Sequence, residues 1–218
     1  MKLKDKACLI EIIGIVLYII FQTLAMIFYA GGTMDDPSIP GYSFWGNTFS
    51  DTGRTVAHNG LSNIISMIFF TIAYSSIAIL FIPFYYIFPR LFSESSKENK
   101  IAVIGSIFGY ISSICFIGVI FTPADILRPP HMIFAYIAYA CIFFMSVAYT
   151  ISLFLQEKMP KFYGYILALF SIFFFTILMV EIAGLNITRL LLVAGQKLNR
   201  IAFFVSFIIL TYGIIKLE

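Results

Sequence analysis

Six apolar runs, each long enough to cross a bilayer, divide this chain of 218 residues. A membrane-spanning helix needs about 17–25 mostly apolar residues, and the runs cover residues 8–30, 61–84, 101–122, 131–154, 162–182 and 201–217. Only 11% of the residues are charged, whereas a soluble domain has about 25%. A soluble core could not hide this much apolar surface. The sequence therefore predicts an all-α integral membrane protein, with residues 1–218 forming one six-span domain.

The first run could also be interpreted as a secretory signal, because it follows the basic segment MKLKDK. It is longer than the roughly 7–15 apolar residues of a signal peptide and lacks an A-x-A exit, which favours a retained span. The net charge of +3, with scattered basic residues, argues against nucleic-acid binding. The third run contains Gly105 and Gly109 at GxxxG spacing, which predicts close helix packing there.

Orientation follows from the distribution of basic residues, because Lys and Arg concentrate on the cytoplasmic side. An even number of spans places both termini together. That side has nine basic residues: Lys2, Lys4, Lys6, Arg90, Lys97, Lys100, Lys158, Lys161 and Lys216. The other side has five: Arg54, Arg128, Arg189, Lys197 and Arg200. We therefore expect cytoplasmic termini, short cytoplasmic loops and, most simply, a plasma-membrane location.

Polar residues gather on the predicted outer side, chiefly in the stretch YSFWGNTFSDTGRTVAHN at residues 42–59. Five of them recur at steps of three and four residues, a spacing that aligns side chains on one helix face: Ser43, Asn47, Asp51, Arg54 and His58. Ionisable residues at the edge of a span are functional candidates by default. The stretch therefore predicts most of a polar pocket that opens outward.

Four more candidates lie on the same predicted side: Asp125, His131, Glu181 and Arg200. Each acidic residue also has a structural interpretation, because a cation lies within reach along the chain. Asp51 could cap a helix or pair with Arg54, Asp125 could pair with Arg128, and Glu181 could pair with Arg189 or Arg200. These alternatives remain open at the level of sequence.

The residue types suggest distinct roles. Asp51, Asp125 and His131 are the candidates for acid–base chemistry, and the ligand-binding candidates are Asn47, Ser50, Arg54, His58, Glu181 and Arg200. A Ser50-His131-Asp125 arrangement can be assembled, but no GxSxG elbow supports it. No HxxxH or HExxH pair is present, so we predict no metal site, and no motif identifies a cofactor.

Two motifs resemble a known family. The stretch Asn47-Thr-Phe-Ser-Asp-Thr-Gly53 resembles the N-x-x-S-D-x-G segment of the six-span family catalogued as domain of unknown function 998. Phe121-Thr-Pro-Ala-Asp125 followed by His131 is similar to that family's F-P-x-D…H segment, and a polar final outer loop ending at Arg200 looks like its pattern. Thr52 and Thr122 depart from the family's pattern.

In outline, that family is similar to the six-span FRAG–DRAM–Sfk group, which is linked to lipid organisation and lipid-anchor remodelling. A more distant likeness is to membrane hydrolases of the alkaline-ceramidase and adiponectin-receptor type, which hold zinc with three histidines. This chain has only two histidines, and neither lies in a late span. The resemblance therefore implies an association with lipids, and the shortage of histidines argues against a zinc hydrolase.

Three functions remain as hypotheses. The first is binding or processing of a lipid head group by Asp51, Arg54, His58, Asp125 and His131. The second is a small proton-coupled transporter, which we disfavour because no ionisable residue is expected deep in a span. The third is a non-catalytic scaffold. Membrane lipids are the expected partners, and the sequence indicates no protein partner.

Overall fold

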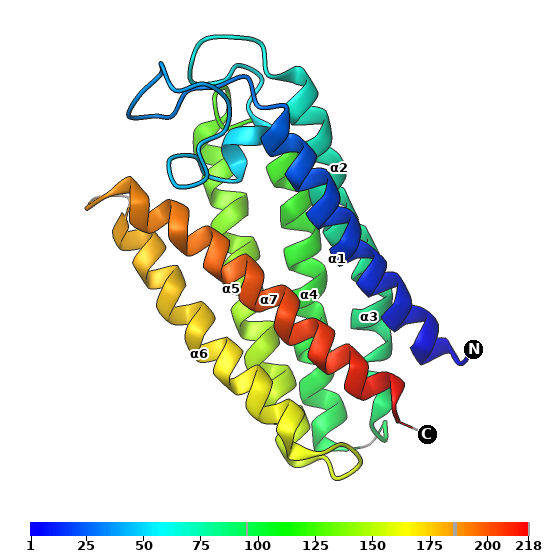
Figure 1. The fold of residues 1–218 in the computed structure, drawn as a ribbon. Helices are drawn as coiled ribbons and strands as arrows, with labels where there is room; N and C mark the ends of the chain where they lie inside the picture. Colours follow the sequence, from blue (N-terminus) through cyan, green and yellow to red (C-terminus); the bar gives the residue numbers. More distant parts are fainter. Residues whose placement is uncertain (95, 185–186, 218) are drawn as a thin grey trace.

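The computed structural model describes residues 1–94, 96–184 and 187–217, and within them it contains six helices long and apolar enough to cross a membrane (Figure 1). The elements are α1 (Leu3–Ile27), η1 (Ser50–Gly53), α2 (Ile64–Leu80), α3 (Ile82–Ile87), η2 (Pro89–Leu91), α4 (Lys97–Ile120), α5 (Arg128–Leu155), α6 (Lys161–Gly184) and α7 (Arg189–Ile215). The described residues include isolated bridges but no strand. The prediction of an all-α membrane protein is confirmed.

The second span consists of α2, α3 and η2, which together cover Ile64–Leu91. Pro83 lies at the start of α3, and its ring removes a backbone donor and disfavours an uninterrupted helix. The span is therefore interrupted near Pro83. It ends at Leu91, beyond the boundary at residue 84 that the sequence predicted.

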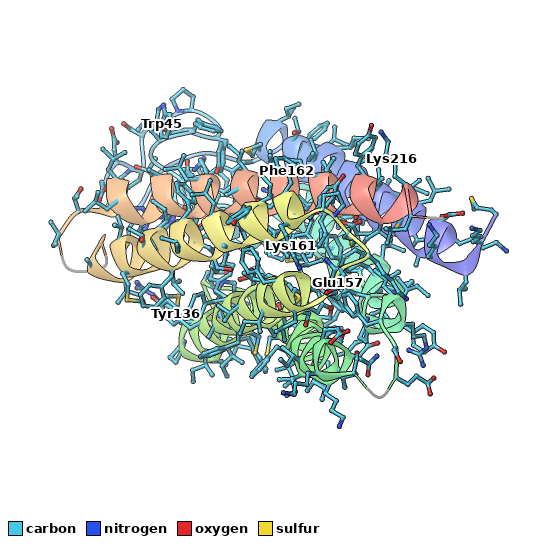
Figure 2. The ribbon with its side chains drawn as sticks, turned by 90° about the horizontal axis from the view of Figure 1, so that it is seen from below. Trp45, Tyr136, Glu157, Lys161, Phe162 and Lys216 are labelled. Carbon is cyan, nitrogen blue, oxygen red and sulfur yellow. The ribbon has the colours of Figure 1, made fainter. Side chains whose placement is uncertain are left out.

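The helices form a closed ring in chain order, because α1 contacts α2, α2 contacts α4, each later helix contacts the next, and α7 returns to α1. Both termini lie at one end of this bundle (Figure 1). The other end, which we call the distal end, is covered by residues 28–63, the distal loop. Figure 2 shows Trp45 of this loop far from Lys216, near the C-terminus.

The interior of the bundle is rich in aromatic rings, and its outer surface carries many aliphatic side chains. Fully buried rings include those of Tyr18, Phe81, Phe84, Tyr149 and Phe207. Each spanning helix exposes large apolar side chains, for example Ile19, Ile68, Ile104, Ile133, Ile172 and Ile201. Such a surface fits lipid tails rather than water.

The sixth span differs most from the sequence prediction. Helix α7 begins at Arg189 rather than near residue 201, so the segment expected to be a polar outer loop is helical. Lys197, Asn199 and Arg200 are buried in the bundle. They lower the hydropathy of this segment, although neighbouring helices shield them from lipid. The prediction that no ionisable residue lies deep in a span was therefore wrong.

Candidate functional site

The distal loop closes on the carboxylate of Asp51, which is 5% exposed. Its Oδ2 accepts hydrogen bonds from the Arg189 guanidinium at 2.8 Å and from the Thr48 backbone N–H at 2.8 Å. Its Oδ1 lies 3.1 Å from Nε2 of His58, and the amide of Asn47 donates to Oδ2 at 3.3 Å. Asp51 therefore ties two parts of the loop to the first turn of α7.

This geometry corrects two predictions about the loop. The stretch 42–59 is not a continuous helix, because only the short 3₁₀ turn Ser50–Gly53 forms there. Asn47 and His58 nevertheless meet Asp51, because the loop folds around the carboxylate. Asp51 pairs with Arg189 rather than with Arg54, whose guanidinium Nε donates to the carbonyl of Val56 at 3.0 Å.

The partners of Asp51 keep it ionised. Burial raises the pKa of this carboxyl, but the hydrogen bond from His58 and the charge of Arg189 outweigh burial and lower the pKa to about 2. An anion held in this way is a poor proton acceptor near neutral pH. The proposed use of Asp51 as a proton carrier is thus less favourable than its use as an anchor.

The lowered pKa predicts a loss of stability in acid. Because the folded pKa lies below the unfolded value of about 4, the contribution of Asp51 is fully present above pH 4. It is lost as the pH falls from about 4 to about 2, and the shift corresponds to about 2 kcal/mol. Unfolding in detergent, measured from pH 7 to pH 2, should show the difference between wild type and Asp51→Asn shrinking on acidification. A difference that stays constant would contradict this assignment.

Asp125 fastens the other side of the loop. Its carboxylate accepts hydrogen bonds from the backbone N–H and the hydroxyl of Thr55, at 3.1 and 2.5 Å, and from the backbone N–H of Val56 at 3.0 Å. Burial raises the pKa of Asp125, but these hydrogen bonds outweigh it and lower the pKa. The predicted pairing with Arg128 was wrong, because backbone donors of the distal loop occupy the carboxylate instead.

His131 lies in the first turn of α5 and is 3% exposed. Its Nδ1 lies 2.7 Å from the backbone carbonyl of Thr122. A carbonyl oxygen only accepts, so Nδ1 carries the proton, and in the neutral ring Nε2 keeps its lone pair. His131 is therefore fixed in orientation and retains one basic nitrogen.

These groups surround a cavity of about 270 Å³ at the distal end. We call it the distal cavity, and its ionisable and hydroxyl-bearing lining residues are Thr48, Ser50, Asp51, Arg54, His58, Asp125, Arg128, His131 and Arg189. Met34, Met132 and Leu192 contribute apolar surface to the same walls. Charged groups and apolar surface thus meet in one cavity.

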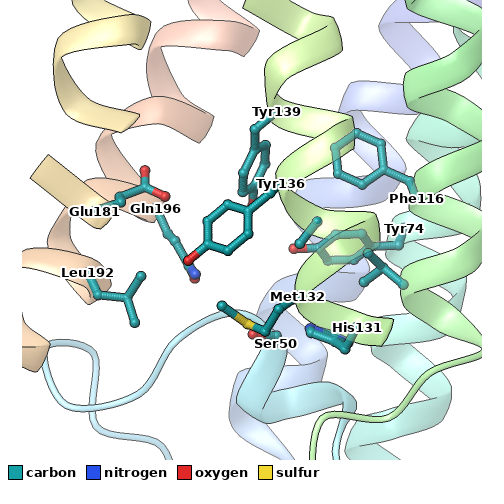
Figure 3. A pocket seen from close by; sticks show the side chains of 12 residues that line it. Ser50, Tyr74, Phe116, His131, Met132, Tyr136, Tyr139, Glu181, Leu192 and Gln196 are labelled. Carbon is teal, nitrogen blue, oxygen red and sulfur yellow. The ribbon is translucent and has the colours of Figure 1, made fainter. Parts of the chain in front are cut away.

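A smaller inner pocket of about 30 Å³ continues into the bundle, and Ser50, His131 and Gln196 line both spaces. Figure 3 shows the ring of Tyr136 between Gln196 on one side and Tyr74 on the other. The Tyr136 hydroxyl is buried and has no hydrogen-bond partner among the described residues. The inner pocket has the volume of about one water molecule. A polar group bound there would accept a hydrogen bond from the Tyr136 hydroxyl.

The structure brings together most of the residues that the sequence singled out. Ser50, Asp51, Arg54, His58, Asp125 and His131 all line the distal cavity. Asn47 lies beneath it, where its side chain donates to the carbonyl of Gly32 at 2.9 Å and also contacts Asp51. Glu181 lines the inner pocket and accepts from the amide of Asn199 at 2.7 Å, not from a cation.

Arg200 lies elsewhere, packed among aromatic rings of α1, α2, α4 and α7, and it lines neither the distal cavity nor the inner pocket. The prediction that Arg200 belongs to the outward site was wrong. Helix α7 begins at Arg189, earlier than its hydropathy indicates, so Arg200 lies within the helix and not in an outer loop. Arg128 and Arg189 occupy that site instead. Sequence spacing had assigned both to pairing with nearby acids, and no signal separated them from Arg200.

Two chemical arrangements considered from the sequence are not formed. The described residues show no hydrogen bond from His131 to Ser50 or Asp125, so a Ser-His-Asp relay is absent there. Over residues 1–94, 96–184 and 187–217, no group of three His, Cys, Asp or Glu side chains could hold a metal ion. The contacting acid–histidine pair is Asp51 with His58.

Comparisons of the chain with known protein families, with curated proteins and with solved structures found no match.

Proposed function

We propose that the protein binds the polar head group of a membrane lipid in the distal cavity. The observation that carries this proposal is the charge around the cavity. Asp51 and Asp125 are already held by Arg189, His58 and the distal loop. Arg54 and Arg128 line the same cavity, and among the described residues neither makes an ion pair with a carboxylate.

Two unpaired arginines favour an anionic head group. A guanidinium binds phosphate through two parallel hydrogen bonds, which gives both affinity and orientation. The apolar side chains of Met34, Met132 and Leu192 in the same walls suit the first part of a lipid tail. A phosphate-bearing lipid is therefore the class of ligand that the cavity matches best.

The distribution of basic residues between the two ends of the bundle supports an outward-facing cavity. Because Lys197 and Arg200 belong to α7, the distal side has three basic residues outside the buried helix interior: Arg54, Arg128 and Arg189. The terminal side has nine, so the asymmetry exceeds the one expected from sequence. We infer cytoplasmic termini in a plasma membrane, with the cavity near the outer leaflet. The resemblance to the family catalogued as domain of unknown function 998 agrees with this proposal.

His131 is the residue best placed to exchange a proton with a bound head group. The carbonyl of Thr122 fixes its ring, and it lines both the distal cavity and the inner pocket. A hydroxyl of a bound head group that reached Nε2 of His131 would find a hydrogen-bond acceptor and base there. Asp51 and Asp125 would act as positioning residues, because both are engaged by protein donors.

Binding can be tested with protein reconstituted in nanodiscs and a short-chain phosphatidic acid as the probe. Arg54→Gln and Arg128→Gln should each weaken binding by about tenfold, since a charge-assisted hydrogen bond contributes about 1.5–3 kcal/mol. Arg90→Gln is the matched control, because Arg90 lies at the opposite end of the bundle and stacks on Tyr86. Unchanged binding in both cavity variants would favour the scaffold hypothesis.

A further inference from the structure

A second space in the bundle lies in the wall between α1 and α7. This α1–α7 groove has a volume of about 380 Å³ and shares no lining residue with the distal cavity or the inner pocket. Most of its lining is apolar, and Ile19, Ile201, Val205 and Ile208 are each more than two-fifths exposed on the outer surface of the bundle. The groove therefore opens sideways, toward lipid tails.

Two cations line this apolar groove. Lys197 and Arg200 are 2% and 6% exposed, and neither makes an ion pair within the described residues. Lys197 donates one hydrogen bond, to the backbone carbonyl of Asn47 at 2.8 Å. The Arg200 guanidinium lies 4.8–5.9 Å from the ring centres of Tyr18, Tyr74, Phe116 and Phe204, and it donates one long hydrogen bond, of 3.5 Å, to the Tyr74 hydroxyl.

Aromatic rings compensate these charges only in part. A desolvated cation–π contact contributes about 2 kcal/mol, whereas the effective cost of burying an ion is several kcal/mol. Ionisable groups inside a membrane bundle usually pair with one another or mark a ligand site. The groove therefore carries a positive charge that a bound anion would neutralise.

Unsatisfied polar atoms in the same groove support a ligand independently. Tyr18 and Gln22 line it, and each is 2% exposed. The Tyr18 hydroxyl and the Gln22 side-chain oxygen have no hydrogen-bond partner within residues 1–94, 96–184 and 187–217. The Gln22 side-chain nitrogen is engaged, since it donates to the hydroxyl of Thr52 at 3.1 Å. Buried polar atoms are normally paired, so the groove offers a free O–H donor on Tyr18, whose ring centre lies 4.8 Å from the Arg200 guanidinium.

We propose that the α1–α7 groove binds a long-chain fatty acid. The carboxylate lies between Lys197 and Arg200, where it accepts a hydrogen bond from the Tyr18 hydroxyl. The chain extends along α7 past Val205 toward Ile208, the end of the groove nearer the termini. Such a molecule neutralises the cations and fills the apolar space at the same time.

Depth in the bundle favours a carboxylate over a phospholipid. At 1.5 Å per residue, Arg200 lies about 16 Å below the first residue of α7, well inside a hydrocarbon layer of about 30 Å. A phospholipid would have to bring its phosphate and glycerol to this depth. A fatty acid has only a small anionic head to desolvate, and the buried cations offset that cost.

Trp45 provides the readout, because it is the only tryptophan in the chain. Its ring packs edge-to-face on Phe44, with centres 4.9 Å apart, and Phe44 lines the groove. Delipidated protein in detergent is titrated with stearate that carries a quenching nitroxide near its head. We expect saturable quenching that unlabelled stearate reverses, and much weaker quenching by the matching labelled alcohol. Equal quenching by acid and alcohol would overturn the proposal.

Two variants test the binding of the carboxylate and of the acyl chain separately. Arg200→Gln should weaken stearate binding by about tenfold or more, as expected for the loss of a charge-assisted hydrogen bond. Val205→Phe keeps both cations and should weaken binding by narrowing the groove, so it serves as the test if Arg200→Gln fails to fold. Lys216→Gln, an exposed change at the residue that follows the last turn of α7, should leave binding unchanged. Wild-type affinity in Val205→Phe, or a co-purified phospholipid that stearate does not displace, would overturn the proposal.

Discussion

Asp51→Asn should lower the free energy of unfolding by about 3 kcal/mol, because removing one partner of a buried ion pair leaves the other charge uncompensated. Asp51 is the one carboxylate that Arg189 and His58 share, and their distances to it are 2.8 and 3.1 Å. Asparagine fills the same volume but carries no charge. The expected result is therefore a loosened distal loop on an intact helix bundle.

Two measurements test this expectation. Unfolding in mixed micelles gives the change in free energy, and trypsin cleavage after Arg54 reports on opening of the distal loop. Asp36→Asn is the matched control, because Asp36 lies in the same loop, is exposed, and its carboxylate accepts hydrogen bonds only from Ser38. It should behave as wild type in both assays.

A double-mutant cycle isolates the ion pair. Arg189→Gln alone should destabilise the protein by an amount similar to Asp51→Asn, and the double variant should lose much less than the sum of the two. Additive losses would show that Asp51 and Arg189 act independently, which would contradict the proposed anchoring of the loop to α7.

Gly105→Leu should have the second large effect, a loss of about 3 kcal/mol from overpacking. A Cβ atom at Gly105 would lie 2.7 Å from the ring of Tyr149, which is fully buried. The ring cannot move freely, because it stacks on Phe88 and its hydroxyl lies 2.9 Å from the hydroxyl of Ser106. The change should therefore separate α4 from α5.

Val103→Leu is the control for that prediction, because Val103 lies on the same helix and is 42% exposed toward lipid. Its unfolding midpoint should match that of wild type. A tolerated Gly105→Leu, with an unchanged midpoint in the same micelles, would show that the Tyr149 ring can move aside at little cost.

The GxxxG pair illustrates how a sequence motif can identify a position without its partner. Gly105 and Gly109 do mark close packing on α4, but they accommodate the rings of Tyr149 and Tyr85 rather than another helix backbone. Spacing along one helix shows where small residues fall. It does not show which side chain from another helix occupies the space they leave.

The sequence alone determined the six-helix architecture, because a bilayer demands apolar helices of a fixed minimum length and penalises every exposed backbone group. It also placed most charged residues outside the spans, since charge is costly within the bilayer. Tertiary structure decided which charges meet. Arg189 is far from Asp51 along the chain but bonds to it in the bundle, whereas Arg54, three residues away, donates to the carbonyl of Val56 instead. Tertiary structure also placed Lys197 and Arg200 inside α7. Neighbouring helices bury these charged side chains and shield them from lipid, an effect that the hydropathy of the sequence cannot represent.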